Sequence, residues 1–487
     1  MVNPSNGRLA DSLQRFSGIL PGEDIQALLA LQEEPLPTGI RINPLKRHPQ
    51  QAIRDLSARY GWQADPIPFC KNAWTLHNVE QPPGTTIEHR LGQYYLQDAA
   101  SMVPVSLFNF DDANPLILDM AASPGGKTTH LVDHTLDKGF IIANDASNSR
   151  IPALRAVLAS WGTINQVVTS YPGEVIGSWF PETFDGILLD APCSMENLRP
   201  TASRPLRETT RSERLRLQER QVELLESGLA ALKVGGQLVY ATCSLAPEED
   251  EAVINALLER YPDVFDIVDV ADKFSFSAPG LNHYADIDFH PTLGHTLRLW
   301  PHLTGMSGFF CALLTKTQSM PTPKASPPQR DFILTGLQPI DPGLGDQVFD
   351  QIQDNYGINL RKVLESHQAE LYRRYDQLFL MPQRYLSHFA RLPFEYIGMP
   401  LGIWREDSLE PSHELISRFG HQFTRGILCI NDDQVNQWIS GRDIRHPDTS
   451  LTAQGQFLMV TDSTERNLGM GKLLPKRLRN MLPRQLI

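Results

Sequence analysis

Short apolar segments alternate with longer amphipathic segments between residues 115 and 261. The short segments are rich in Val, Ile and Leu, and strands separated by helices of roughly 10–15 residues are typical of a parallel sheet covered by helices. Such strands are buried on both faces, so their apolar runs are nearly continuous. The sequence therefore predicts an α/β domain. Its strands are predicted at 115–120, 140–145, 165–170, 184–192 and 236–244.

The segments outside this region follow other patterns. The first 75 residues mix short helical patterns with one extended candidate at 38–45. Four prolines within 318–332 indicate a linker, and the residues after it show short candidate strands without a βα rhythm. The expected divisions are an N-terminal extension (1–75), a central α/β domain (76–317), the linker (318–332), a small connecting subdomain (333–395) and a C-terminal α+β or β module (396–487).

The composition is that of an ordinary globular protein. Hydrophobic residues make up 41% and charged residues 21% of the 487 residues, which excludes wholesale disorder. No apolar run approaches the roughly 20 residues of a membrane span, and the N-terminus lacks the apolar core of a signal peptide. The five cysteines are scattered, which argues against a disulfide framework and a cysteine-rich zinc site. We expect a cytoplasmic protein with reduced thiols and no metal.

The net charge of −12 is acidic and counts against a nucleic-acid partner. Binding depends on local patches, however, and two basic segments are present. Residues 199–220 contain seven arginines, and residues 466–484 contain six basic residues and no acidic one. Each segment is compatible with a solvated face as well as with RNA binding. In the second segment the candidate RNA contacts are Lys476, Arg477 and Arg479.

A glycine-rich turn follows the first predicted strand, in the segment LDMAASPGGKT at 118–128. It places small residues and a helix start at the carboxyl end of a strand, where ligands approach the backbone of α/β domains. The spacing is not that of a Walker A loop, and the absence of GxGxxG disfavours a dinucleotide. Asp145 ends the second strand, where a carboxylate binds ribose hydroxyls or caps a helix. A purely structural turn remains the alternative for the glycine segment.

Two cysteines follow the ends of predicted strands. Asp190 and Cys193 lie in the segment DAPCS after one strand, and Cys243 lies in TCS after the next. Because ligands of open α/β sheets bind outside the carboxyl ends of the strands, the acid and the two thiols point to one crevice. The other cysteines are expected to be small buried hydrophobic residues. These are Cys70, Cys311 and Cys429.

At these residues the chain resembles the Sun-type RNA (cytosine-5) methyltransferases. The resemblance implies a Rossmann-like class I methyltransferase core that uses S-adenosyl-L-methionine, preceded by an N-terminal α+β RNA-binding extension. The chain is most similar to bacterial members that methylate 16S ribosomal RNA, which implies a C-terminal PUA-like RNA-binding module. The similar segments are RIN at 41–43, YYLQDAASM at 94–102, DMAASPGGKT at 119–128, ANDASNSR at 143–150, DAPCS at 190–194, ATCS at 241–244, PEEDEAV at 247–253 and RLWPH at 298–302.

The resemblance also implies roles for single residues. Cys243 is the nucleophile that adds to C6 of the cytosine, and Cys193 assists release of the methylated RNA; the residues alone leave these two roles open. The chemistry is sound because C5 of cytosine is a poor nucleophile until a thiolate adds at C6. Asp190 serves N3 of the base and pairs with Lys127. The cofactor contacts implied are Ala121, Ala122, Ser123, Pro124, Gly125, Gly126, Lys127, Asp145, Arg150, Pro172 and Asp190, and a further RNA contact implied is Arg41.

Three positions depart from the family pattern. Pro172 lies where relatives carry an aspartate, so it offers no side-chain acceptor to the adenine amino group. Met195-Glu196-Asn197 replaces the usual glycine–acid–glycine after DAPCS, and Ser307 replaces an aspartate. None of them removes a residue with an implied catalytic role, so we expect a methyltransferase for C5 of a cytosine in 16S ribosomal RNA.

Two other functions stay open. One is a methyltransferase-fold, RNA-binding ribosome assembly factor with little activity, which the altered loop and Pro172 favour. The other is a cytosine-C5 methyltransferase that acts on transfer RNA. For the main interpretation we expect ribosomal RNA or the small ribosomal subunit as partner, no DNA, no membrane and a monomeric chain.

Overall fold

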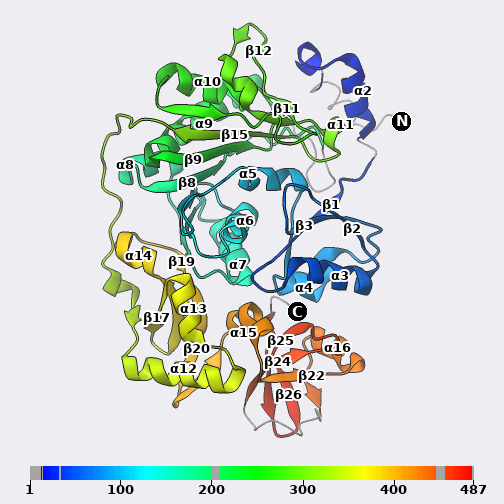
Figure 1. Cartoon of the computed structure of the whole chain (residues 1–487), viewed down its shortest axis with the longest axis vertical. Helices are drawn as coiled ribbons and strands as arrows, with labels where there is room; N and C mark the ends of the chain where they lie inside the picture. The colour runs from blue at the N-terminus through cyan, green and yellow to red at the C-terminus, as the bar shows by residue number, and fades with distance from the viewer. Residues whose placement is uncertain (1–12, 14, 32–33, 200–208, 446–455, 485–487) are drawn as a thin grey trace.

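The computed structural model describes residues 13, 15–31, 34–199, 209–445 and 456–484 (Figure 1). Among these residues, ten strands form a central sheet in the order β11-β14-β15-β9-β8-β5-β6-β7-β19, with β10 paired to β15. The five strands from β9 to β7 are parallel, which confirms the predicted α/β class. The strands are β5 (Leu116–Asp119), β6 (Phe140–Asn144), β7 (Gln166–Thr169), β8 (Phe184–Asp190), β9 (Leu232–Thr242), β10 (Phe265–Val268), β11 (Ala278–Pro279), β14 (Leu297–Leu299), β15 (Phe309–Lys316) and β19 (Tyr396–Ile397).

Helices cover both faces of the central sheet (Figure 1). Leu118 belongs to the hydrophobic cluster that holds Leu225 of α9, whereas its neighbour Ile117 belongs to the cluster that holds Val132 of α6. Successive side chains of a strand point to opposite faces, so β5, β6, β8 and β9 each contribute to both clusters. The helices are α5 (Val103–Ser106), α6 (Gly126–His134), α7 (Ile151–Trp161), α8 (Ile176–Trp179), α9 (Arg211–Ala231), α10 (Glu251–Arg260) and α11 (Pro301–Thr304). Among the described helices, none combines the length and apolarity that crossing a membrane requires.

A smaller antiparallel sheet with strand order β2-β3-β1-β4 precedes the central domain. The division expected at residue 75 falls inside β3, and β4 pairs with β1, so this sheet extends to residue 96. The pairing joins segments some fifty residues apart, which local sequence patterns do not reveal. The elements are η1 (Arg15–Gly18), α2 (Gly22–Ala30), β1 (Thr38–Ile42), α3 (Pro49–Tyr60), β2 (Gln63–Pro66), β3 (Ala73–His77), α4 (Ile87–Arg90) and β4 (Tyr94–Leu96).

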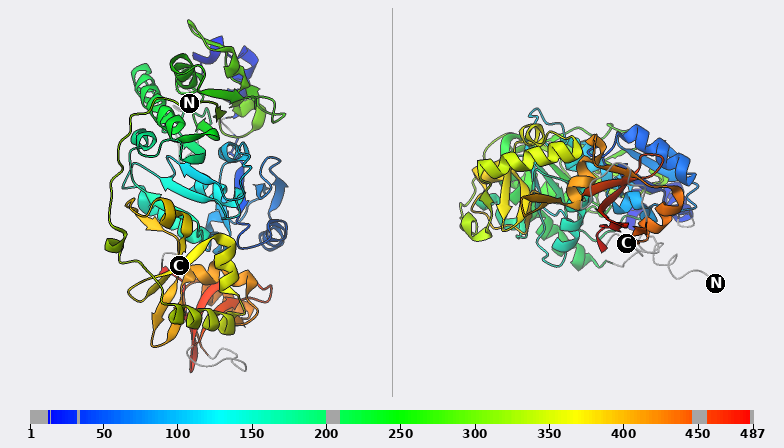
Figure 2. Two further views of the ribbon diagram at one scale, coloured as in Figure 1. Left: turned by 60° about the vertical axis from the view of Figure 1, so that its left-hand side comes forward. Right: turned by 90° about the horizontal axis from the view of Figure 1, so that it is seen from below.

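The chain leaves the central domain through 318–331, which contains no helix or strand and runs along its side to the second half (Figure 2). Two small sheets follow, in the orders β16-β17-β18-β20-β21 and β22-β24-β25-β26-β23. The division expected at residue 396 cuts the first sheet, because β18 pairs with β20, while β19 between them joins the central sheet. The PUA-like character of the last module stays a prediction.

The elements of the second half, in chain order, are β16 (Gln338–Pro339), α12 (Pro342–Tyr356), α13 (Leu360–His367), β17 (Ala369–Arg374), β18 (Gln377–Pro382), α14 (Gln383–His388), β20 (Met399–Arg405), β21 (Ser408–Pro411), α15 (His413–Phe419), β22 (Ile427–Cys429), α16 (Asp432–Ile439), β23 (Ile444–Arg445), β24 (Phe457–Thr461), β25 (Asn467–Leu474) and β26 (Arg477–Asn480). A short hairpin, β12 (His283–Tyr284) with β13 (Ile287–Asp288), belongs to the central domain.

Helix α15 joins the three parts of the molecule. The buried ammonium of Lys46, from the loop after β1, donates to the carbonyl of Leu91 at 2.7 Å and to the hydroxyl of Ser417 on α15 at 2.7 Å. Arg418 donates to the carbonyls of Leu45 and of Gly162, which follows α7. Burial lowers the pKa of Lys46 to about 7, with Arg418 adding to the shift. Polar contacts buried at this joint hold the C-terminal half in a defined orientation.

Candidate active site

The two cysteines predicted to share a crevice do meet. β8 and β9 are parallel neighbours, with Asp190 opposite Ala241, so the segments that follow them leave the sheet side by side. The Sγ atoms of Cys193 and Cys243 lie 3.3 Å apart, and both residues are partly exposed. The parallel arrangement read from the apolar pattern is therefore sufficient to bring the thiols together.

A buried carboxylate fixes the two cysteine loops. Glu249 accepts a hydrogen bond from the amide of Ser194 at 2.8 Å and from the hydroxyl of Ser244 at 3.0 Å. Its side chain also accepts from the Ser194 hydroxyl, and Gln221 of α9 donates to the carbonyl of Pro192 at 2.9 Å. One acid thus holds the residue after each cysteine. We did not predict from the sequence that Glu249 fixes the two loops, although Glu249 lies in the PEEDEAV segment on which the family resemblance rests.

The two thiols differ in their electrostatics. The hydrogen bond with Cys243, together with burial, raises the pKa of the Cys193 thiol well above its usual value. The neighbouring thiol and burial therefore both disfavour a thiolate on Cys193. A thiolate, not a thiol, is the nucleophile in cysteine chemistry. The 3.3 Å contact is the same for both thiols, so the assignment of Cys243 as the attacking group stays a prediction.

Lys127 and Asp190 form an ion pair beside the thiols, as expected. The ammonium of Lys127, at the start of α6, donates to Oδ2 of Asp190 at 2.7 Å. Burial lowers the pKa of Lys127, but the negative charges of Asp190 and Cys243 outweigh it, so that the net shift is upward from 10.5. A fixed positive charge next to Cys243 stabilises its thiolate. The site thus combines two thiol groups with a carboxyl group and an ammonium.

The glycine-rich turn between β5 and α6 forms a close-packed cradle. Gly125 has a φ of +110°, and a Cβ there would lie 2.9 Å from Cγ1 of Val157. Gly126 is equally tight, because its Cβ would lie 2.9 Å from the ring of Tyr95. At the end of β5, Oδ2 of Asp119 accepts from Thr128 at 2.7 Å, whereas its buried Oδ1 has no hydrogen-bond partner among the described residues. Burial raises the pKa of Asp119 to about 7. A buried acceptor without a hydrogen-bond partner, beside a glycine-rich turn, is suited to receive a hydrogen bond from a polar ligand.

Asp145 and Pro172 lie where the sequence places them, after β6 and β7. Asp145 is buried and accepts from the amides of Ser123 at 3.1 Å and Ser147 at 2.9 Å. Arg150, about half exposed, lies 3.5 Å from the same carboxylate. Asp145 therefore ties the glycine-rich turn to the neighbouring loop. Pro172 is exposed.

Arg41, which we predicted as an RNA contact, does not reach the surface of the protein. It is fully buried in β1, where it forms an ion pair with Asp133 and donates to the carbonyl of Gly126 at 2.9 Å and to Thr129 at 2.6 Å. Three of its contacts are with α6, so Arg41 attaches the N-terminal sheet to the helix that begins at the glycine-rich turn. With Gln97 as a further acceptor, four of its five N–H donors have partners inside the protein, and its full burial keeps it from phosphate in this conformation.

Other expectations also need correction. Arg466, the first residue of the basic C-terminal segment, is buried and pairs with Glu88 at 3.3 Å, so it joins two modules and is not exposed to a partner. Among the seven arginines of 199–220, Arg199 is buried against the carbonyl of Gly305, and Arg204 and Arg207 lie outside the described residues. Cys70 and Cys311 are buried as predicted, but Cys429 is exposed.

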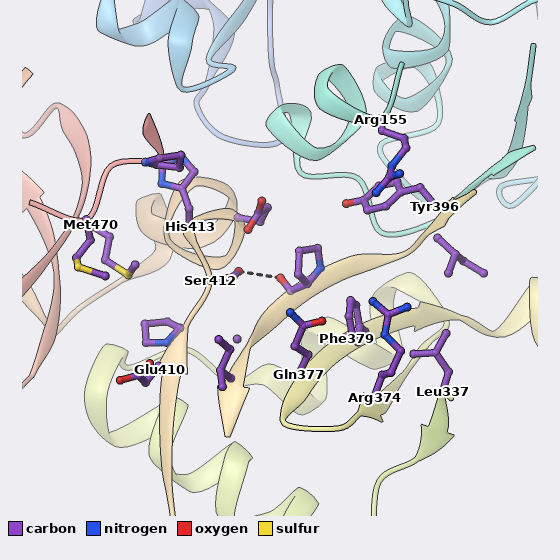
Figure 3. Close-up of a pocket in the computed structure, with 18 of the residues that line it drawn as sticks. Arg155, Leu337, Arg374, Gln377, Phe379, Tyr396, Glu410, Ser412, His413 and Met470 are labelled. Atoms are coloured by element: carbon purple, nitrogen blue, oxygen red, sulfur yellow. Dashed lines mark hydrogen bonds between the residues drawn. The ribbon is translucent and has the colours of Figure 1, made fainter. Parts of the chain in front are cut away.

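A separate cavity of about 630 Å³ lies between the central domain and the C-terminal half (Figure 3). Arg155 of α7 and Tyr396 of β19 face His413 and Met470 across it. Burial lowers the pKa of His413 to about 3, so this histidine is neutral. The described residues that line the cavity include none of those predicted for catalysis. This cavity is therefore separate from the candidate active site at the ends of β8 and β9.

The parallel sheet, the glycine-rich turn after its first central strand and the acid after the next define a class I methyltransferase, and the two cysteine loops place it among those with paired thiols. Residues 107–315 match the family described as 16S rRNA methyltransferase RsmB/F, and residues 11–99 match the N-terminal domain of 16S rRNA methyltransferase RsmF. The chain belongs to the family of ribosomal RNA small subunit methyltransferase F.

The similarity to individual members extends over nearly the whole chain. Ribosomal RNA small subunit methyltransferase F of Aeromonas salmonicida is 31% identical over 481 residues, which are 98% of this chain and 96% of that protein. The protein of the same name from Escherichia coli strain SE11 is 32% identical over 464 residues, 94% of this chain and 92% of its own length. The crystal structure of a methyltransferase homologue from Pyrococcus horikoshii is 30% identical with a TM-score of 0.55, covering 65% of this chain and all of its own.

S-adenosyl-L-methionine is the methyl donor of this enzyme class and supplies an electrophilic methyl group on a sulfonium. The residues present fit it. The open Oδ1 of Asp119 provides an acceptor at the glycine-rich turn, and Asp145 stands at the strand end that serves ribose hydroxyls in doubly wound folds. Pro172 can contribute only apolar contact or its carbonyl.

Asp145→Ala should weaken binding of S-adenosyl-L-methionine by roughly 10- to 150-fold, because a charge-assisted acceptor is worth about 1.5–3 kcal/mol. Part of the loss will come from the turn, since the amide of Ser123 also loses its acceptor. Calorimetry measures the affinity, and RNA binding should stay nearly unchanged. Ser170→Ala is the matched control, because within the described part of the chain this hydroxyl donates to the carbonyl of Asp145 and to the side chain of Asn148 and to no other group. Wild-type affinity in Asp145→Ala would contradict the assignment.

Proposed function

We propose that the chain transfers a methyl group from S-adenosyl-L-methionine to C5 of a cytosine in 16S ribosomal RNA through a covalent adduct with Cys243. The observation that carries the proposal is the 3.3 Å contact between Cys193 and Cys243 beside the Lys127–Asp190 ion pair. The names of the full-length relatives support ribosomal RNA of the small subunit as substrate. We further infer a monomer that works on RNA and not on DNA in the cytoplasm, where ribosomal RNA is available.

The first half of the proposed reaction activates C5. The thiolate of Cys243 adds to C6, and the electron pair of the C5–C6 double bond moves through the ring to N3. Asp190 supplies a hydrogen bond or a proton there in its protonated form, since its ionised form only accepts. C5 then has the nucleophilic character of an enamine and takes the methyl group. Lys127 holds Asp190 in place, and its positive charge compensates the negative charges of Asp190 and of the Cys243 thiolate.

The second half releases the product, and the coupling of the thiols explains how Cys193 contributes. The pKa of Cys193 is high chiefly because of its interaction with Cys243. Once the sulfur of Cys243 is bonded to C6, it carries no negative charge and this effect ends. Cys193 can then lose its proton and, as a base, remove the proton from C5. The double bond re-forms, the C6–S bond breaks, and Cys243 leaves as a thiolate.

The test is transfer of labelled methyl groups from S-adenosyl-L-methionine to small-subunit RNA that lacks cytosine-5 methylation, supplied either as free RNA or as assembled subunits. We expect incorporation at C5 of a cytosine and none into transfer RNA. Transfer to transfer RNA alone would favour the second enzyme hypothesis. Binding of ribosomal RNA without any methyl transfer would favour the assembly factor.

The C-terminal hairpin, formed by β25 and β26, should contribute to RNA binding. Lys476, Arg477 and Arg479 are exposed on or next to β26, while Leu473 and Leu478 anchor the hairpin in the core. Replacing the three cations with alanine should weaken RNA binding and lower the slope of log affinity against log salt by roughly 2, because each lost phosphate contact removes about 0.7–0.9. Fluorescence anisotropy over a salt series measures both quantities.

A matched control for the hairpin is Arg405→Ala, since Arg405 is also exposed and, like Arg477, pairs with an aspartate at the surface, Asp376. Its salt slope should equal that of the wild type. An unchanged affinity and slope in the triple variant would mean that the hairpin is only a solvated face.

A further inference from the structure

Met195 is a large apolar side chain displayed at the surface next to the catalytic thiols. Its exposed fraction is 56%, although Met normally gains stability from burial. Its φ is +61°, in the left-handed region that residues other than glycine rarely adopt, because the backbone is strained there. Neither feature benefits the folded state. A strained backbone conformation and an exposed apolar side chain at the same residue, close to a candidate active site, indicate that the residue has a function.

The backbone of Met195 contacts the thiol of Cys193. Its amide donates to the thiol of Cys193. The two following residues are fixed as well: the carbonyl of Glu196 accepts from the amide of Leu245 at 3.1 Å, and the carbonyl of Asn197 accepts from Gly308 at 2.9 Å. The side chain of Met195 therefore extends from a fixed backbone, two residues after Cys193.

The N-terminal segment strengthens this backbone from outside. Arg15 forms an ion pair with the buried carboxylate of Glu196 and contacts Glu248 at 3.4 Å. Leu198 is buried in the same hydrophobic cluster as Phe16. The loop is thus held from both ends, and among residues 194–199 the large exposed apolar group is Met195.

We propose that Met195 inserts into the base stack of the RNA next to the target cytosine and keeps that cytosine extruded. This inference rests on the proposed function. Attack at C6 requires access to the face of the ring, and a stacked base has both faces covered. Large apolar side chains, Met among them, are known to insert between stacked bases of nucleic acids. There they replace the stacking contacts that the neighbouring base loses. The flexible, polarizable thioether of Met adapts to the face of any base.

The experiment compares Met195→Ala with the wild type on two RNAs of the same sequence around the cytosine, one folded into a hairpin and one short and unstructured. On the hairpin, kcat/KM should fall about 10- to 100-fold, since a few kcal/mol of unstacking are no longer compensated. On the unstructured RNA the change should stay within about 3-fold, since little stacking has to be broken. Met195→Leu should keep most of the wild-type rate on both RNAs.

A second readout reports insertion directly. With 2-aminopurine in place of the nucleotide next to the cytosine, binding of the wild type should raise the fluorescence of the probe, and binding of Met195→Ala should not. Leu136→Ala is the matched control, because Leu136 is 54% exposed and has a φ of +51° but lies before β6, at the opposite end of the parallel strands. It should behave as the wild type in both assays.

Equal losses of kcat/KM on the two RNAs would overturn the proposal and assign Met195 to positioning Cys193. Wild-type rates of Met195→Ala on the hairpin would also overturn it. Failure of the proposed function is recognised separately, because the wild type would then methylate neither RNA, whereas the fluorescence change depends only on binding. A fluorescence rise in Met195→Ala equal to that of the wild type would contradict insertion by itself.

Discussion

Cys193→Ala should accumulate a covalent protein–RNA adduct, whereas Cys243→Ala should form none and lose methyl transfer completely. Without the Cys243 thiolate no bond to C6 forms, so C5 is not activated. Without Cys193 the adduct still forms and C5 still takes the methyl group. Removal of the C5 proton then lacks its base, and RNA stays bonded to Cys243.

A denaturing gel with labelled RNA measures this difference as a band of reduced mobility. The band should be absent from Cys243→Ala and from the double variant, and weak or transient in the wild type. Cys429→Ala is the control for the removal of a thiol, because Cys429 is exposed in the C-terminal half, away from the site. An adduct in Cys243→Ala, or none in Cys193→Ala beside an active wild type, would reverse or refute the assignment.

At pH 8, Arg41→Met should destabilise the contact between the N-terminal sheet and α6 by about 3–5 kcal/mol, because it leaves a buried carboxylate without its positively charged partner. Burial already raises the pKa of Asp133 to about 7, outweighing the opposing effect of Arg41. In the native state Asp133 thus binds a proton at pH values where the unfolded chain has lost it, so the free energy of unfolding falls as pH rises from about 4 to 7. The variant, which lacks the opposing cation, should therefore be less stable at pH 8 than at pH 6.

Hydrogen exchange of the amides of β1 and α6 at the two pH values measures the local opening free energy. Arg47→Met is the control, since Arg47 forms a partly exposed ion pair with Asp55 and should cost at most about 1 kcal/mol. The salt dependence of RNA binding should be unchanged in Arg41→Met. Unchanged protection together with a smaller salt slope would restore the original prediction that Arg41 contacts RNA.

The apolar pattern was sufficient to predict the central sheet and, through it, the meeting of Asp190, Cys193 and Cys243. The reason is local: strand length, apolar runs and intervening helices specify parallel strands, and parallel neighbours end at the same edge. The glycine-rich turn and Asp145 were found for the same reason. Each of these residues lies at the carboxyl end of a predicted strand or in the turn directly after it, so predicting the strand also predicts its position.

The tertiary structure alone decided which charges are buried and which segments share a sheet. Arg41 looks like a candidate phosphate contact until Asp133, 92 residues later, is seen beside it, and Arg466 pairs with Glu88 of another module. Glu249 likewise joins two loops that belong to different strands. The division of the C-terminal half depends on β18 pairing with β20 across the strand β19 that joins the central sheet. Burial and ion pairing are properties of neighbours in space, and no periodicity in the chain encodes partners so far apart.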